Sequence, residues 1–208
     1  MIISRRHRYI FFPIPKTGTH AVRRALREHM GPEDLEQVGL FVHKRFPFPE
    51  FANIQHGHIR SQDIRPVLGE AEFRSLFKFA FVRNPFDRFV SYCAFMGREN
   101  GVFEQQPLRF MKHMIRAPAS TNHLLFQPQH RMLTDESGAL EIDFVGRHET
   151  LQASYDQVCE RIGIASAPLE RVNASRHRPW QEYYDPELVG LVSAVYARDL
   201  ELFDYRFE

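Results

Sequence analysis

A short apolar run, a basic loop containing glycine and an amphipathic stretch follow one another near the start of this chain. The run spans Tyr9 to Ile14, and the loop after it reads Pro15-Lys16-Thr17-Gly18-Thr19-His20. Four apolar residues then share one helical face: Ala21, Val22, Ala25 and Leu26. This order predicts a buried strand, a tight turn and a helix. Such a junction directs backbone N–H groups and the positive end of the helix dipole at one spot, which predicts an anion site.

The residue order of this loop differs from that of a Walker A loop, in which four residues separate two glycines and Lys and Ser or Thr follow the second. Here Lys16 precedes Gly18. Gly18 permits the turn, Thr17 and Thr19 offer hydroxyls, and Lys16 can reach a bridging oxygen of the ligand. Turn chemistry alone also accounts for these residues, so the loop by itself leaves both interpretations open.

A second strand-to-helix junction follows Phe79-Ala80-Phe81-Val82, which has the apolar character of a buried strand. Asn84 is a favourable N-cap, and Pro85 suits the first helical position. Asp87 stands where a capping carboxylate reaches back to the helix start. The sequence therefore predicts that a helix begins at Pro85, and Asp185-Pro186 predicts the start of the last helix.

Arg83 at the strand end and Ser91 in the helix form a candidate phosphate clamp. Ser91 lies two turns into the predicted helix, on the side of Asp87. A guanidinium and a hydroxyl at that spacing suit a phosphate. The alternative is that Arg83 pairs with Asp87, and that Ser91 is merely a small helix residue.

Two anion-binding junctions in one chain suit a nucleotide that carries phosphate at both its 5′ and 3′ positions. The loop Pro15 to Thr19 is similar to the 5′-phosphosulfate loop of the sulfotransferases, and Arg83 with Ser91 is similar to their 3′-phosphate motif. The resemblance covers nearly the whole chain. It is closest to the carbohydrate branch that contains the chondroitin and uronyl 2-O-sulfotransferases. Both phosphate cradles are then expected to face one crevice.

Later segments are also similar to that branch: residues 144–151, 172–175, 183–186, 195–196 and 199–205. The resemblance implies an α/β, P-loop-like three-layer sandwich with a central parallel sheet and helices on both faces. It further implies 3′-phosphoadenosine-5′-phosphosulfate (PAPS) as donor and adenosine 3′,5′-bisphosphate (PAP) as product. The acceptor is a hydroxyl, for which an oligosaccharide is the expected source, and no metal is required.

The candidate donor contacts are ten residues: Pro15, Lys16, Thr17, Gly18, Thr19, His20, Arg83, Ser91, Arg176 and Arg178. His20 departs from the family pattern, because many relatives carry serine or threonine there. Either Thr19 and the backbone suffice, or His20 donates instead, or His20 makes no contact. Arg176 and Arg178 occupy a place where relatives carry basic residues near the 3′-phosphate. Trp180 is interpreted as a packing anchor rather than an adenine platform.

Sulfuryl transfer needs a base for the acceptor proton and a group that supports the departing oxygen. Lys16 suits the second role. For the first, Ile54, His56 and His58 alternate on one face of a short extended segment, and Gly57 allows a close approach. The His-Gly-His triplet also resembles the one that supplies the base in uronyl 2-O-sulfotransferases. We expect His58 to be the base and His56 to orient it. No convincing third or fourth metal ligand stands near this pair.

The composition sets broader limits. At 208 residues and 43% hydrophobic content, the chain suits one domain over residues 1–208. Residues 97–137 are predicted to form an irregular insertion that covers the acceptor.

Cys93 and Cys159 fall on helical patterns, which favours buried core thiols and a reducing compartment. No apolar stretch spans a bilayer, so we expect a cytoplasmic, bacterial protein. The net charge of +1 argues against nucleic-acid binding.

Two other functions fit parts of the pattern. A small-molecule kinase of the P-loop fold predicts a Walker loop, which is absent, and a carboxylate for Mg²⁺. A non-catalytic module that binds adenosine bisphosphate or a sulfated glycan predicts that Lys16 and His58 are dispensable. The acceptor's identity, its sulfated position and the oligomeric state do not follow from the sequence.

Overall fold

The computed structural model describes residues 1–39, 43–170 and 178–208. The chain divides into two compact units. Unit 1 comprises Met1–Val82 and His130–Val172, and unit 2 comprises Arg83–Gln129 and Asn173–Glu208. Among the described residues, the chain passes between the units at residues 82/83 and 129/130.

Unit 1 is built on a five-stranded sheet with the order β3-β1-β2-β4-β5. The strands are β1 (Ile2–Ser4), β2 (Tyr9–Phe12), β3 (Leu35–Glu36), β4 (Phe77–Val82) and β5 (Phe144–Arg147). β2, β4 and β5 are parallel, with Phe11 opposite Phe79 and Phe79 opposite Phe144. The predicted strands at both junctions are thus confirmed, as is the parallel centre of the sheet.

The sheet departs from the predicted all-parallel arrangement at β1, which pairs antiparallel with both β2 and β3. Only four residues, 5–8, connect β1 to β2. Such a short connection permits a hairpin, whereas a parallel pair requires a crossover of a dozen or more residues. Arg8 takes up the sharp reversal with a positive φ of 56°.

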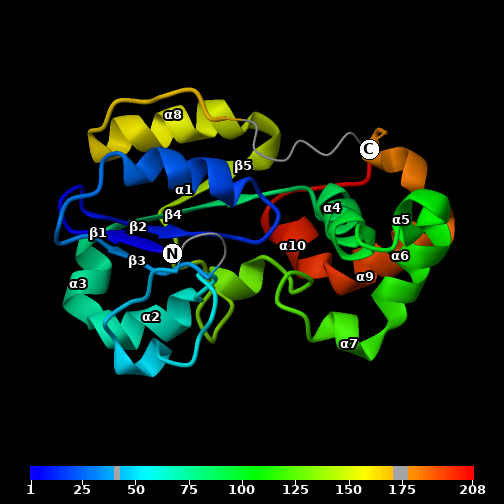
Figure 1. Ribbon diagram of the computed structural model, residues 1–208, viewed down its shortest axis with the longest axis horizontal. Helices are drawn as coiled ribbons and strands as arrows, with labels where there is room; N and C mark the ends of the chain where they lie inside the picture. Colours follow the sequence, from blue (N-terminus) through cyan, green and yellow to red (C-terminus); the bar gives the residue numbers. More distant parts are fainter. Residues whose placement is uncertain (40–42, 171–177) are drawn as a thin grey trace. The chain divides into compact units, whose positions relative to one another are not determined.

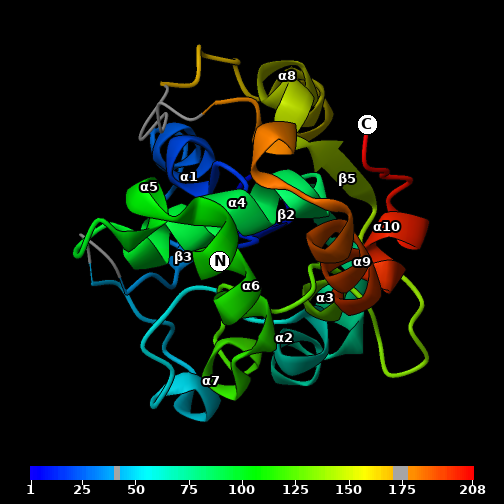
Figure 2. The same cartoon turned by 90° about the vertical axis from the view of Figure 1, so that its right-hand side faces the viewer.

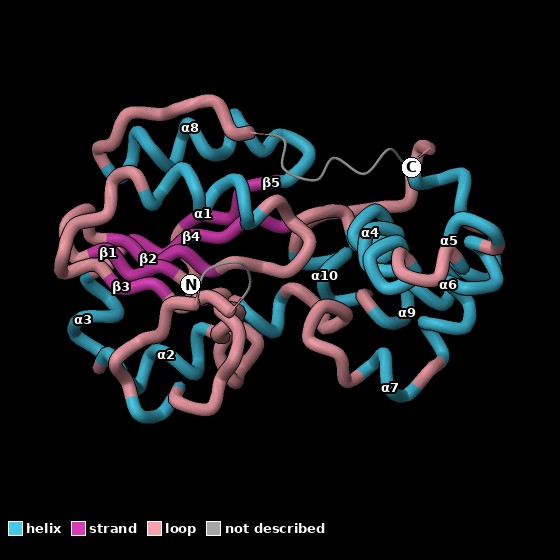
Figure 3. Tube along the Cα trace, in the orientation of Figure 1, coloured by secondary structure: helices cyan, strands magenta, loops and turns pink. Residues whose placement is uncertain are grey.

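Helices cover both faces of the unit 1 sheet, as predicted. α1 (Thr19–Arg27) and α8 (Leu151–Ile162) lie on one face, and α2 (Ser61–Leu68) and α3 (Glu70–Ser75) lie on the other (Figures 1 and 3). The α1 and α8 side buries an apolar cluster that includes Val22, Phe79 and Tyr155. Unit 1 is therefore a three-layer mixed α/β structure; its likeness to P-loop proteins stays a prediction.

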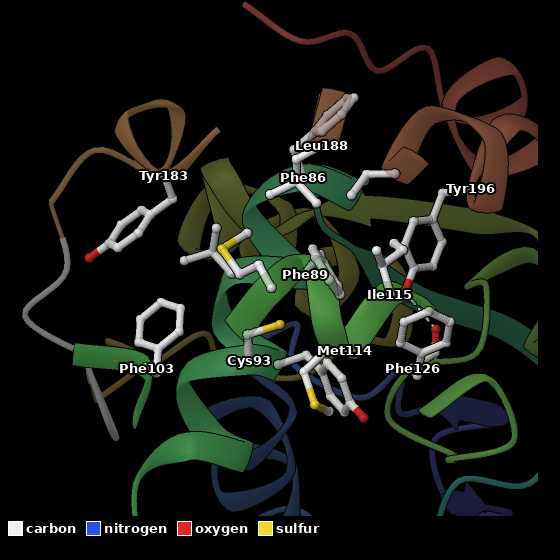
Figure 4. Packing of buried hydrophobic residues seen from close by; sticks show 14 residues of the cluster. Phe86, Phe89, Cys93, Phe103, Met114, Ile115, Phe126, Tyr183, Leu188 and Tyr196 are labelled. Carbon is white, nitrogen blue, oxygen red and sulfur yellow. Dashed lines mark hydrogen bonds between the residues drawn. The ribbon is translucent and has the colours of Figure 1, made fainter. Parts of the chain in front are cut away.

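Unit 2 is helical in its described residues. It contains α4 (Pro85–Gly97), α5 (Val102–Gln105), α6 (Pro107–Arg116), α7 (Pro118–Thr121), α9 (Pro186–Val195) and α10 (Ala197–Leu202). α4, α6 and α9 pack on one another (Figure 2). Their shared core contains Phe86, Phe89, Phe126 and Tyr196 (Figure 4). Trp180 stacks on Phe86 with the ring centroids 5.9 Å apart, in agreement with its interpretation as a packing anchor.

The helix starts read from sequence are confirmed. The Asn84 side chain accepts from the Phe86 N–H at 3.0 Å, and Asp185 accepts from the Leu188 N–H at 2.9 Å, so each caps its helix. The Asp87 carboxylate pairs with Arg83, which is the alternative that the sequence also allowed.

Residues 97–137, predicted as one irregular insertion, are more regular than expected. Residues 97–129 contain α5 to α7 in unit 2, whereas residues 130–137 belong to unit 1. Their role over the acceptor and the single-domain organisation stay predictions. Cys93 and Cys159 are both buried and unbridged, as expected of core thiols. Among the described residues, no helix combines the length and apolarity needed to cross a membrane.

Candidate functional site

The loop between β2 and α1 reverses direction through two left-handed residues. Lys16 has φ 68° and Gly18 has φ 83°. Between them the buried Thr17 hydroxyl donates to the Ile14 carbonyl at 3.0 Å. Thr17 therefore braces the turn, which adds a structural role to the ligand contact predicted from sequence. Because L-residues rarely occupy positive φ, the lysine position is set by the loop rather than by side-chain preference.

The N-terminus of α1 has the electrostatic character of an anion site. Within the described part of the chain no side chain caps it, and its first turn contains no acidic residue. The Gly18 carbonyl accepts the first helical hydrogen bond, from the Ala21 N–H at 3.1 Å. The positive end of the helix dipole is thus not offset by a local carboxylate. This geometry suits the anion predicted for Lys16 to Thr19.

Two features require glycine at position 18: its positive φ, and neighbouring side chains that leave no room for a Cβ. A Cβ placed there would lie 2.7 Å from Leu151 Cδ2 and 3.2 Å from His148 Nδ1. The loop is therefore covered by the short 3₁₀ helix His148–Thr150, which precedes α8. The sequence did not predict that His148 lies beside this loop. It shows only that His148 directly follows the strand Phe144 to Arg147.

His58 is held against the beginning of the same loop. Its Nδ1 lies 2.6 Å from the carbonyl oxygen of Pro13, the residue after β2. A carbonyl can only accept, so Nδ1 carries the proton and Nε2 has the lone pair. The structure thus places a neutral imidazole, with a defined tautomer, at the strand end from which the loop begins.

His56 contacts the backbone of His58 rather than its ring. The His58 N–H donates to His56 Nδ1 at 3.3 Å, and the two ring centroids are 6.1 Å apart. The Pro13 carbonyl is the observed partner of the His58 ring, so the proposed orienting role of His56 has to act through the main chain. The segment is irregular rather than extended. A Cβ at Gly57 would lie 2.1 Å from the Gln37 carbonyl oxygen, which explains the glycine.

Burial keeps the histidines of this region neutral. It lowers the pKa of His58 to about 3, an effect that the hydrogen bond to Pro13 only partly opposes. It also lowers the pKa of His56 and His20. For His20, the positive charges of Arg23 and Lys16 act in the same direction. All three imidazoles are consequently in the form that can accept a proton.

These shifts predict a loss of stability in acid. Because the folded-state pKa of His58 is below the ordinary value of 6.5, the unfolded chain takes up the proton first as the pH falls. The stabilisation is complete above pH 6.5 and declines toward pH 3. We expect His58 to reduce the free energy of unfolding by about 2 kcal/mol between pH 7.5 and pH 5. Urea unfolding at both pH values checks this, and a His58→Asn variant with an equally steep decline would contradict it.

Two arginines of α1 and one lysine surround a buried carboxylate. The Glu36 carboxylate is completely buried and faces three cations: Arg27 at 2.8 Å, Lys44 at 3.3 Å and Arg23 at 3.5 Å. Arg23 is only 4% exposed. Its Nε and Nη2 have no hydrogen-bond partner among the described residues. Burial lowers the pKa of Arg23 to about 10, so it remains charged.

This excess of positive charge favours an anionic ligand at the loop. Three cations face one carboxylate, and the charge of Arg23 also affects the pKa of His20 and His58. Arg23 Nε faces Glu36 at 3.5 Å, whereas Nη2 is buried without a hydrogen bond among the described residues, and such a group is costly unless a charge compensates it. The residues present therefore fit the phosphosulfate group of the expected donor. The sequence did not identify Arg23 or Glu36 as site residues. Nothing in a helical or strand pattern distinguishes a buried charged side chain from an exposed one.

In unit 2, Arg83 makes a two-pronged ion pair with Asp87. Arg83 Nε and Nη2 donate to the two carboxylate oxygens of Asp87, each at 2.7 Å. This is the alternative pairing that the sequence left open. Ser91 lies on α4 and is 8% exposed. The phosphate role of both residues stays a prediction.

The remaining predicted contacts lie in the C-terminal segment. Arg178 is exposed, pairs with Glu182 at 3.9 Å and lies over the ring of Tyr183 at 4.9 Å. Arg176 lies outside the described residues, as does the segment 172–175 quoted for the resemblance. Among the residues that the structure describes, no three His, Cys, Asp or Glu side chains gather in a metal-binding arrangement.

Comparison with known proteins assigns the whole chain to one family. A family model described as "Sulfotransferase family" matches residues 1–206. Searches of curated proteins and of solved structures returned no match. The match covers both units and all the candidate residues discussed above.

Proposed function

The chain belongs to the sulfotransferase family, and from this premise we propose that it transfers a sulfuryl group from PAPS to a hydroxyl of a carbohydrate, leaving PAP. One observation carries the proposal. His58 is held by the Pro13 carbonyl with its Nδ1 protonated, at the strand end where the Lys16 loop begins. A base and a cation beside one anion-binding turn are what an in-line sulfuryl transfer requires.

His58 acts as the general base in this proposal. Its Nε2 accepts the proton of the acceptor hydroxyl while that oxygen forms the new bond to sulfur. Nδ1 keeps its hydrogen bond to Pro13, so the imidazolium that forms is stabilised by a carbonyl dipole. In the unliganded protein the pKa of His58 is low. We expect it to rise when an anionic donor binds, because a nearby negative charge favours the imidazolium.

Lys16 and the first turn of α1 support the departing oxygen. When the sulfur–oxygen bond of the donor breaks, the electron pair passes to the oxygen that bridges to the 5′-phosphate. The proposed role of the Lys16 ammonium and of the N–H groups after Gly18 is to stabilise that charge, which the left-handed turn and the uncapped start of α1 support. Thr19 and His20 in this turn remain proposed donor contacts. The acceptor proton passes to His58, the sulfuryl group passes to the acceptor oxygen, and no metal takes part in the proposed transfer.

Arg83 and Ser91 are the proposed residues for the 3′-phosphate. A guanidinium that already presents two N–H groups to a carboxylate has the geometry to bind phosphate in the same way. Arg176 and Arg178 remain secondary candidates. Residues 97–137 are proposed to contact the acceptor, and a cytoplasmic location remains the expectation.

We expect Arg83→Ala to weaken PAP binding by about 10- to 100-fold with little change in kcat. A phosphate contact made equally in the ground and transition states affects affinity rather than turnover. Isothermal titration with PAP, together with donor KM and kcat, measures both effects. Asp87→Asn is the matched control: it removes the ion pair but keeps the guanidinium, and should not weaken PAP binding. An unchanged PAP Kd in Arg83→Ala would show that the 3′ assignment is wrong.

The overall activity is tested with radiolabelled sulfate donor and a panel of oligosaccharides and small alcohols. Transfer of label to a sugar hydroxyl, together with release of PAP, supports the proposal. Label transferred only to a non-carbohydrate alcohol would confirm the reaction and overturn the acceptor class. Intact PAP binding without transfer to any acceptor would instead indicate a binding module.

A further inference from the structure

Gln129 makes an unusual contact with the backbone of Arg83. Its side chain is completely buried. Gln129 Oε1 accepts from the Arg83 N–H, and Nε2 donates to the Arg83 carbonyl, both at 2.9 Å. Only this amide orientation satisfies both partners, so the network also determines which atom is nitrogen. The side chain thus bonds both peptide groups of Arg83, the first residue after β4.

We propose that Gln129 is a positioning residue for Arg83, and that it sets the guanidinium geometry on which recognition of a 3′-phosphate depends. The inference rests on the proposed function, since it takes Arg83 as the phosphate ligand. Arg83 is held at both ends: Gln129 holds its peptide groups, and Asp87 holds its guanidinium through two bonds of 2.7 Å. A pre-organised guanidinium loses less freedom when phosphate replaces or joins the carboxylate.

Other buried groups also anchor the main chain around Gln129. Arg88 Nη2 donates to the carbonyls of Leu125 at 3.0 Å and Gln127 at 2.8 Å. The Tyr196 hydroxyl donates to the Phe126 carbonyl at 2.7 Å (Figure 4).

Gln129 itself is tethered through its backbone. Its N–H donates to the carboxylate of Asp199, a residue that is 0% exposed, at 2.7 Å. Hydrogen bonds thus anchor the main chain at Leu125, Phe126, Gln127 and Gln129, while the side-chain amide of Gln129 bonds to Arg83. Residues 83 and 129 are also where the long helical excursion of unit 2 begins and ends. The amide therefore joins the two ends of that excursion.

The test compares two nucleotides that differ only in the 3′-phosphate, PAP and adenosine 5′-monophosphate. Gln129→Met keeps the side-chain length and removes both hydrogen bonds to Arg83. We expect roughly tenfold weaker PAP binding, a similar rise in donor KM and little change in kcat or in the affinity for adenosine 5′-monophosphate. Tyr196→Phe is the matched control. It removes one buried hydrogen bond of the same segment, and should lower Tm without changing the ratio of the two affinities.

A double-mutant cycle shows whether Gln129 acts through Arg83. In an Arg83→Ala background, Gln129→Met should leave PAP affinity unchanged, because the group that it positions is gone. Should Gln129→Met fail to fold, Gln129→Glu, which still accepts from the Arg83 N–H, should show the same selective loss in weaker form.

Three outcomes are distinguishable from one another. Equal weakening of both nucleotides by Gln129→Met would reveal a purely structural role and overturn the inference. So would unchanged PAP binding in Gln129→Met while Arg83→Ala weakens it, although the proposed function would then stand. If Arg83→Ala itself leaves PAP binding unchanged, the 3′ assignment fails, and the inference about Gln129 fails with it.

Discussion

Lys16→Met is expected to lower kcat by about 10²- to 10³-fold and to change the donor Kd by no more than a few-fold. The ammonium is proposed to act where negative charge builds up on the departing oxygen, so its contribution is larger in the transition state than in the bound ground state. Methionine matches the length of the lysine stem without its charge. Single-turnover rates with labelled donor and direct titration with PAP separate the two quantities.

Two further variants control for the backbone of the loop. Lys16 has φ 68°, where every residue with a Cβ is strained, so Lys16→Met should not alter loop strain. Lys16→Gly relieves that strain and should retain or raise Tm, yet lose the same activity. Lys16→Arg keeps the charge and should retain more activity than either. Equal losses in donor affinity and turnover for Lys16→Met would contradict a role confined to the leaving group.

His58→Asn is expected to lower kcat by about 10²- to 10⁴-fold, because a general base normally contributes that much. The asparagine amide can still donate to the Pro13 carbonyl, which in the native protein accepts from His58 Nδ1 at 2.6 Å. Folding and the loop are therefore retained, whereas the proton acceptor is lost. The rate of product formation at saturating donor and acceptor measures the effect.

The matched control for this variant is His56→Asn. His56 reaches only the backbone N–H of His58, at 3.3 Å, so its replacement should cost less than tenfold in kcat. The native pH–rate profile should also have an acidic limb, which His58→Asn removes. If His56→Asn caused the larger loss, the assignment of base and orienting residue would be reversed.

The elements that proved predictable are those with strong local signals. The strand before Lys16, the strand before Arg83, and the helix starts at Asn84-Pro85 and Asp185-Pro186 all depend on residues within one or two turns. An N-cap side chain bonds an N–H only two or three residues away, so a short window of sequence contains the whole interaction. The helical pattern around Cys159 is confirmed in the same way, because Cys159 lies on the buried face of α8.

The pairing of β1 with β3 and the 3₁₀ cover at His148 depended on contacts between distant segments. β1 is only three residues long, Ile2–Ser4, too short to show a period in sequence. His148 reaches Gly18 across 130 positions of the chain, and Gln129 reaches Arg83 across 46. No local pattern encodes such partners, because residues so far apart along the chain meet only in the folded protein.

The sequence by itself determined the chemistry: a lysine and a glycine in a strand-to-helix turn, an arginine at the end of the next strand, and a His-Gly-His triplet. The tertiary structure decided how those groups are held. It gave His58 its tautomer through Pro13, left Arg23 buried beside Glu36, and bound Arg83 between Gln129 and Asp87. Residue type fixes what a group can donate or accept, whereas burial and the choice of partner depend on segments that only the folded chain brings within hydrogen-bond distance.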